Sequence, residues 1–209
     1  MLGVDYFALI YIPYLFWMTQ EKLSLFKPTN QQLLSVSNFV LFRYILGLSY
    51  NQWLTKEYNN FFYGLFQLAV CFGFEEIYTY FVHRFIHNNR TLYRFVHKMH
   101  HQTRAESFIL AFYMSPLEIA IILYPSSSIG LWLCYFYGIN HYALELWYIG
   151  ALYFFLWTHR GISSTTDDLR STMAKLMPDT EHHWTHHQRP NYNFGAHFLD
   201  KLFKTCYTT

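Results

Sequence analysis

Three short segments place histidines at spacings that suit metal binding. They are HRFIH at residues 83–87, HKMHH at 97–101 and HWTHH at 183–187. On a helix, residues three or four positions apart share a face, and neutral imidazole is the commonest protein ligand for zinc, iron, copper and nickel. No single ion needs eight histidines. The pattern therefore predicts that two metal ions share His83, His87, His97, His100, His101, His183, His186 and His187.

The plain alternative is that these histidines lie on solvated helix faces. A single HxxxH pair is as compatible with a solvated face as with a metal ion. Three segments together, two of them HxxHH, are hard to explain in that way. The sequence contains no HExxH motif, so a zinc protease with its glutamate between two histidines has no support.

The remaining four histidines are expected to have different roles. His159, in WTHRG, follows the last long apolar stretch and is expected near the three segments as a ninth ligand. His182 points about 100° away from His183 on the same helix, which predicts a surface residue or one that supports the ligands. His141 lies eighteen residues before His159, about 27 Å along a helix, and so belongs at the far end unless the chain breaks. His197 is expected to have no metal role.

Polar residues upstream of the first segment could support the ligands. Glu76, Tyr80, His83 and His87 are spaced four, three and four residues apart and form one stripe on a helix. Glu76 could accept a hydrogen bond from an imidazole N–H and fix its tautomer. Alternatively, the stripe could pack against neighbouring helices. NNRT at 88–91 is expected to break the chain between the first two ligand helices.

The third segment is expected to form a short helix of its own. Pro178 and Asp179 provide a start signal and Pro190 ends the helix. The polar stretch at residues 161–172 before it is expected to be a loop.

The composition indicates a protein surrounded by membrane lipid rather than by water. Hydrophobic residues make up 53% of the 209 residues and charged residues only 13%, whereas about a quarter of residues are charged in soluble proteins. A spanning helix needs roughly 20 apolar residues. Some apolar stretches could instead be buried helices of a soluble protein, because charged residues interrupt them. The stretches, of which the first is marginal, cover residues 6–18, 33–50, 61–82, 108–124 and 129–157.

The last stretch is too long for one span. It would measure roughly 43 Å as a single helix, against a hydrocarbon core of about 30 Å, and Gly138 to His141 is the natural break. Residues 108–157 must leave the cytosolic side and return, with PSSS at 125–128 as the expected turn. This hairpin would bring the histidines before and after it to one face.

The distribution of basic residues supports this topology. With the histidines in the cytosol, every Lys and Arg except Arg43 and Lys56 falls on that side, as the positive-inside rule requires. The sequence therefore predicts an all-α, polytopic membrane protein with a single domain over residues 1–209. We expect about four to five transmembrane or re-entrant helices and a cytosolic, histidine-rich helical cap that holds a di-metal site.

These segments resemble the membrane-bound fatty acid hydroxylase and sterol desaturase superfamily of histidine-box lipid oxidases. The resemblance runs through HRFIH, HKMHH, a hairpin that begins SPLE, HRG and HWTHH, and it covers about residues 72–205. It continues in PNYNFG and LDKLFKT, where Asn191, Tyr192 and Asp200 match family positions. SPLE stands where many members have HP-x-E, and FKT replaces the commoner FGT, which leaves subfamily and substrate open.

The resemblance implies a cytosolic centre of two iron ions, with zinc possible in purified protein, and dioxygen as co-substrate. The eight histidines and His159 would hold the metals, with Glu76, Tyr80, Asn191 and Asp200 as candidates for supporting positions. The substrate would be a sterol or a fatty-acyl or sphingoid lipid in the endoplasmic reticulum or a bacterial inner membrane. Because the sequence contains no flavin or GxGxxG motif, electrons would come from separate proteins of the cytochrome b5 and reductase type. No nucleic acid partner is expected.

Three functions are compatible with these features. The first is oxygen-dependent hydroxylation of a lipid C–H bond. The second is desaturation by the same architecture, which no residue in the sequence distinguishes from hydroxylation. The third is a non-catalytic membrane protein that keeps a histidine-bound metal for structure or binding.

Overall fold

The computed structural model describes residues 29–53, 60–103, 110–138, 140–159 and 180–207. The all-α prediction is confirmed for these residues, which contain helices and no β-strand. Three expectations lie outside the described residues: the marginal span at 6–18, the loop at 161–172, and the start signal at Pro178 and Asp179.

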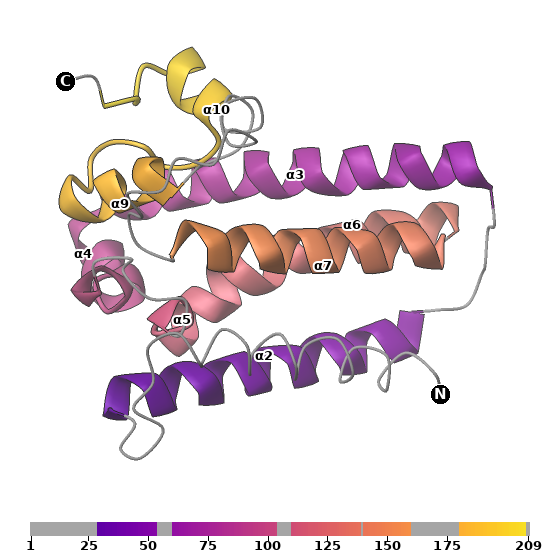
Figure 1. The fold of residues 1–209 in the computed structure, drawn as a ribbon, viewed down its shortest axis with the longest axis horizontal. Coiled ribbons are helices and arrows are strands. Elements are labelled where there is room, and N and C mark those ends of the chain that lie inside the picture. The colour runs from indigo at the N-terminus through magenta and orange to yellow at the C-terminus, as the bar shows by residue number, and fades with distance from the viewer. Residues whose placement is uncertain (1–28, 54–59, 104–109, 139, 160–179, 208–209) are drawn as a thin grey trace.

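Long helices run side by side and form the body of the molecule (Figure 1). The hairpin of α6 and α7 lies between α3 on one side and α2 on the other. These helices fall on three of the predicted apolar stretches, because α6 and α7 both lie mainly on residues 129–157. Their bounds are Asn30–Trp53 for α2, Phe61–Asn88 for α3, Tyr124–Tyr137 for α6 and His141–Thr158 for α7.

By length and composition, α3 is the one helix among the described residues that could cross a membrane. Large apolar side chains near its start are exposed, with Phe61 71%, Phe62 78% and Phe66 63% accessible. Such a surface suits contact with lipid. The number of spans and the cytosolic position of the cap stay predictions.

The predicted hairpin between residues 108 and 157 is present, but the expectation that PSSS at 125–128 forms its turn is wrong. PSSS lies inside α6, which continues from α5 (Pro116–Glu118) and the π-helix η4 (Ile119–Leu123). The π-helix changes the hydrogen-bond pattern just where Pro125 has no N–H to donate. The Ser126 hydroxyl donates to the carbonyl of Leu123 at 3.0 Å instead of capping a turn.

The chain reverses at Gly138, between α6 and α7, where the sequence predicted a break. Gly138 has φ 89°, a conformation that glycine adopts without steric cost. Buried Gln67 of α3 fixes this turn from both sides: its amide donates to the Gly138 carbonyl at 2.6 Å and accepts from the Asn140 N–H at 2.9 Å. The hairpin is therefore held against α3 at the end away from the histidines.

The main core lies among α2, α3, α7 and the segment before α5. Buried Asn38 of α2 donates to the carbonyls of Phe112 and Met114 at 2.9 and 3.0 Å, which attaches that segment to α2. The buried side chains of this core are Phe39, Phe42, Cys71, Ala111, Phe112, Met114, Ile119, Leu144, Trp147, Tyr148 and Leu156.

Short helices gather at one end of the body, beside the ends of α3 and α7 (Figure 1). The predicted break at NNRT is confirmed, because Asn89 ends α3 and its side chain accepts from the Thr91 and Leu92 N–H groups. The helix of the third segment ends before Pro190, as predicted. The short elements are α4 (Arg90–Leu92), the π-helix η1 (Tyr93–His97), the 3₁₀ helix η2 (His100–Gln102), α9 (Thr180–Gln188) and α10 (His197–Leu202).

The hydrogen bonds of Gln67 make a prediction about stability. Gln67→Leu leaves the Gly138 carbonyl and the Asn140 N–H without this partner, so we expect a loss of about 1 to 3 kcal/mol in the free energy of unfolding. Denaturation of the purified protein in detergent measures this loss. Gln188 is exposed, and Gln188→Leu is the control, expected to unfold as the wild type does. Equal stability of both variants would contradict this role for Gln67.

Candidate metal centre

The structure brings together all nine histidines predicted as metal ligands and divides them into two groups. Within each group, the candidate ligand atoms lie within 4.8 Å of one another. That these groups bind metal stays a prediction at this point. The first group consists of His83, His87, His97, His101 and His186, and the second of His100, His159, His183 and His187.

Each HxxHH segment contributes to both groups. In HKMHH, His97 and His101 belong to the first group, whereas His100 belongs to the second. HWTHH has the opposite arrangement, with only its middle histidine, His186, in the first group. Positions i+3 and i+4 differ by about 100° around a helix, so one short helix can face two sites. The sequence predicted two metals but not this division of their ligands.

Hydrogen bonds at Nδ1 fix the tautomer of four rings. Each of these Nδ1 atoms lies 2.7 Å from a backbone carbonyl oxygen. A carbonyl oxygen only accepts, so Nδ1 carries the hydrogen and Nε2 keeps its lone pair. The pairs are His83 with Phe194, His159 with Phe155, His186 with Tyr192, and His187 with Thr103.

The Nε2 lone pairs then face one another inside each group. In the second group, Nε2 of His183 lies 3.1 Å from Nε2 of both His159 and His187, and a single N–H on His183 could satisfy only one of them. In the first group, Nε2 of His83 and Nε2 of His97 are 2.8 Å apart. Two nitrogens bound at right angles to one ion, each at roughly 2.1 Å, are about 3.0 Å apart. The donor sets therefore fit one cation in each group.

Burial keeps the imidazoles in the neutral form that binds metal. Burial, followed by the proximity of His159, lowers the pKa of His187 to about 3, and burial lowers the pKa of His159 to about 4. Burial and the neighbouring imidazoles hold the pKa of His97, of His100 and of His186 well below the usual histidine value. These rings are ready ligands at neutral pH.

Glu118 is a supporting residue that the sequence reasoning missed. Its Oε1 lies 2.8 Å from Nδ1 of His97, and both side chains are buried. The Ser115 hydroxyl accepts from the Glu118 N–H at 3.1 Å and donates to the Val96 carbonyl at 2.5 Å, so the start of α5 is attached to η1. The available signal was an acid inside an apolar stretch, which is a functional hypothesis by default in a membrane protein.

Asp200 organises the loop whose carbonyls hold two of the histidines. Its Oδ1 accepts from the Phe194 N–H at 3.0 Å and the Thr205 hydroxyl at 2.7 Å. Its Oδ2 accepts from the Gly195 N–H at 3.1 Å and pairs with Nε2 of His182 at 2.9 Å. Asp200 thus acts on the ligands through the backbone of residues 192–195.

The other predicted supporting residues, Tyr80, Glu76 and Asn191, differ in their contacts. The Tyr80 hydroxyl is buried and pairs with the Thr205 hydroxyl at 2.8 Å, which links α3 to Asp200. Glu76 is close enough to the Ala196 N–H for a hydrogen bond. Asn191 is exposed and lies outside both groups.

His182 is buried rather than on the surface, and its ring lies against that of His197. Together with Cys206 these residues form a third set of candidate ligand atoms. The two ring centroids are only 3.9 Å apart, closer than the 4.5 Å between the rings of His159 and His183. The two rings, tilted by 38°, are in direct contact, and we assign no metal to this set. The side chain of His141 lies outside the described part of the structure.

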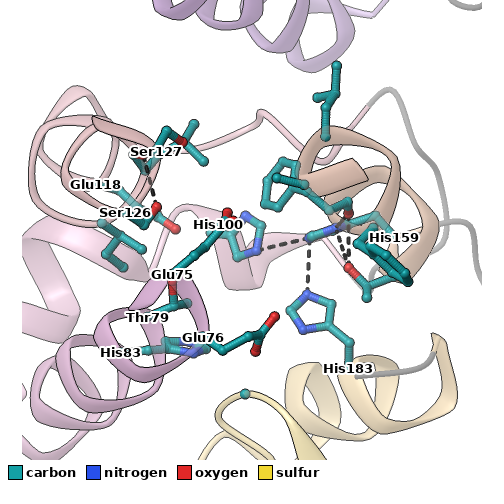
Figure 2. A pocket seen from close by; sticks show the side chains of 18 of the residues that line it. Glu75, Glu76, Thr79, His83, His100, Glu118, Ser126, Ser127, His159 and His183 are labelled. Carbon is teal, nitrogen blue, oxygen red and sulfur yellow. Dashed lines mark hydrogen bonds between the residues drawn. The ribbon is translucent and has the colours of Figure 1, made fainter. Parts of the chain in front are cut away.

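A cavity lies between the histidines and the apolar side chains of the long helices (Figure 2). Glu75 and Glu76 of α3, Glu118 and Ser126 border it. Its lining combines mainly apolar side chains with a few polar groups and histidines, as in many ligand sites. The histidines that line it are His83, His97, His100, His159 and His183.

Comparisons with known proteins agree with the geometry. The family model described as fatty acid hydroxylase matches residues 68–205. A methylsterol monooxygenase of Aspergillus fumigatus is 28% identical over 69% of this chain and 49% of its own length. The C-4 methylsterol oxidase of Schizosaccharomyces pombe is 29% identical (68% and 47%), and methylsterol monooxygenase 1 of Rattus norvegicus is 31% identical (67% and 47%). This chain thus spans about half the length of these relatives. No solved structure matches it.

The contacts of Asp200 predict a loss of metal when its charge is removed. Asp200→Asn replaces an acceptor by a donor opposite backbone N–H groups, so the loop that holds His83 and His186 should loosen. We expect lower metal content and a loss of about 1 to 3 kcal/mol in the free energy of unfolding. Elemental analysis and denaturation measure both. Lys201→Gln, at an exposed neighbour, is the control, and wild-type metal content in Asp200→Asn would refute this role.

The low pKa values predict how the metal-free protein responds to acid. Unfolded histidines take up protons as pH falls below about 6.5, whereas the buried rings do not. The free energy of unfolding therefore has its full value above that pH. Below it, the free energy of unfolding decreases by up to about 1.4 kcal/mol per pH unit for each such histidine. Denaturation at pH 7.5, 6.5 and 5.5 measures the slope, which His187→Asn should reduce. A stability that is constant or rises toward pH 5.5 would contradict the prediction.

Proposed function

The chain belongs to the fatty acid hydroxylase family, and from this premise we propose that it is an oxygen-dependent lipid monooxygenase. It hydroxylates a C–H bond of a sterol or of a fatty-acyl or sphingoid lipid through two iron ions. The observation that carries the proposal is the convergence of Nε2 lone pairs, fixed by Nδ1 hydrogen bonds, beside a cavity with apolar walls.

Each histidine group would hold one iron ion. The bound iron supplies the activation of dioxygen that an unactivated C–H bond requires. The protein holds the Nε2 atoms in place through carbonyl acceptors on the segments around Thr103, Phe155, Tyr192 and Phe194. The Glu118 carboxylate orients His97 in the same way, as outer hydrogen-bond partners do for metal-bound histidines.

The cavity would place the lipid beside the histidines and keep water away from them. Phe72 from α3, Leu123 from η4 and Phe155 from α7 contribute apolar walls. A lipid chain that enters from the membrane meets the same kind of surface as in the bilayer. The exclusion of water protects the reaction from side reactions.

The site also suggests where the protein works. An exposed apolar α3 and a histidine cap at its C-terminal end support an integral membrane protein of the endoplasmic reticulum, or of a bacterial inner membrane, with the cap in the cytosol. Its electrons would come from separate donor proteins of the cytochrome b5 and reductase type.

Lipid mass spectrometry tests the function. Cells that express the chain with a reductase system should accumulate a lipid whose mass is increased by one oxygen atom, and cells without it should not. A product that has lost two hydrogens would instead identify a desaturase. Purified protein that holds only zinc after reduction and reconstitution with ferrous iron, and that forms no product, would exclude both oxidase activities.

Single histidine variants test the assignment of ligands. His186→Ala removes a ligand from the first group, so iron loading and product should both be lost. His197→Ala is the matched control, because His197 belongs to neither group, and it should keep both. Equal loss in the two variants, measured by elemental analysis and lipid mass spectrometry, would show that the assigned ligand set is too narrow.

A further inference from the structure

Two residues that line the cavity each carry a buried polar side-chain atom with no hydrogen-bond partner in the described part of the chain. The two atoms are Nδ1 of His100 and Oε2 of Glu118. Each residue is only 3% exposed. Figure 2 shows both side chains bordering the cavity. An unpaired buried polar group destabilises the protein, so a ligand that pairs with both atoms binds more tightly.

The partners of the two side chains define what each atom can do. Nε2 of His100 points at Nε2 of His159, 3.2 Å away, inside the second group. With Nε2 as the ligand atom, the ring hydrogen of neutral His100 is on Nδ1, which is therefore a donor. Oε1 of Glu118 is taken by His97 at 2.8 Å, which leaves Oε2 as an acceptor. These two atoms thus offer one donor and one acceptor.

We propose that His100 and Glu118 bind a hydroxyl group of the lipid substrate. The hydroxyl donates to Oε2 of Glu118 and accepts from Nδ1–H of His100. A hydroxyl offers one donor and two lone pairs, whereas an ether or a ketone can only accept. The proposal rests on the lipid oxidase function given above and names the polar group that the lipid must carry.

The position of His100 adds a consequence for the site of oxidation. His100 contributes its Nε2 to the second group and its Nδ1 to the hydroxyl, so one imidazole ring separates the hydroxyl from the metal ligand set. The oxidised carbon therefore lies within a few bonds of the carbon that bears the hydroxyl. An acyl chain oxidised far from its polar end does not fit this arrangement.

The neighbouring structure holds the two residues in place. Glu118 lies at the end of α5, whose first turn is capped by Ser115, and the π-helix η4 follows directly. His100 begins η2, which ends where the buried Thr103 hydroxyl donates to the His100 carbonyl at 2.9 Å.

Binding of matched alcohols and ethers tests the proposal. The probes are a 4-methylated sterol and a long-chain alcohol, each compared with its own methyl ether, on the iron-loaded full chain in nanodiscs. We expect at least one alcohol to bind about tenfold more tightly than its ether, because one hydrogen bond is lost. If neither alcohol is preferred, the proposal is overturned. It is also overturned if a buried water, and not the lipid hydroxyl, forms the hydrogen bonds to His100 and Glu118.

The same assay separates this proposal from the proposed function. Product formation from any probe or membrane lipid reports the function, whereas the alcohol-to-ether affinity ratio reports the hydroxyl site, with or without turnover. Oxidation of a preferred alcohol at a carbon remote from its hydroxyl would contradict the predicted site of oxidation while leaving the oxidase function intact.

Glu118→Gln tests the acceptor directly. The glutamine carbonyl can still accept from His97, but its NH₂ group cannot accept from the hydroxyl, so the alcohol-to-ether ratio should fall to about one. A merely structural role would weaken the binding of all probes alike and leave the ratio unchanged, which would overturn the proposal. Metal content is measured in parallel, and Glu181→Gln, at an exposed position of α9, is the control expected to keep the wild-type ratio.

Discussion

The structure depends on one constraint, which is that imidazole lone pairs face one another in a buried space. Neutral nitrogens that only accept hydrogen bonds repel at 2.8 to 3.2 Å, and burial removes the water that could separate them. The fold maintains this arrangement because backbone carbonyls hold the opposite side of several rings. The histidine cap therefore depends on backbone carbonyl acceptors as much as on the histidines themselves.

The acceptors come from a long helix and from the loops beside it. Phe155 lies in the last turn of α7, and Phe194 and Tyr192 lie in the loop between α9 and α10. The end of α3 contributes His83 and His87 directly. Gln67 holds the hairpin turn against α3 at the opposite end. Gln67 thus holds the hairpin at one end of the bundle, and backbone carbonyls orient the histidine rings at the other.

The spacing of the histidines was a better guide to the candidate site than the apolar pattern was to the fold. Same-face spacing and the breaks at NNRT and Pro190 located the three histidine segments, because these signals are local. The division of His100 and His186 between groups could not be predicted, since it depends on which helix lies opposite each face. The role of Glu118 was missed for the same reason, because its partner His97 is 21 residues away. The PSSS turn was wrong because serines bonded within a helix resemble a turn in sequence.

The crossed contribution of the HxxHH segments would link the two proposed ion sites thermodynamically. An ion bound by one group would fix the backbone of both HKMHH and HWTHH, and each of these segments also carries histidines of the other group. The loss of conformational entropy would then be shared, so that a second ion would meet a site that is already ordered. Binding of the two proposed ions would be cooperative, and the centre would pass from empty to full with little of the singly loaded form.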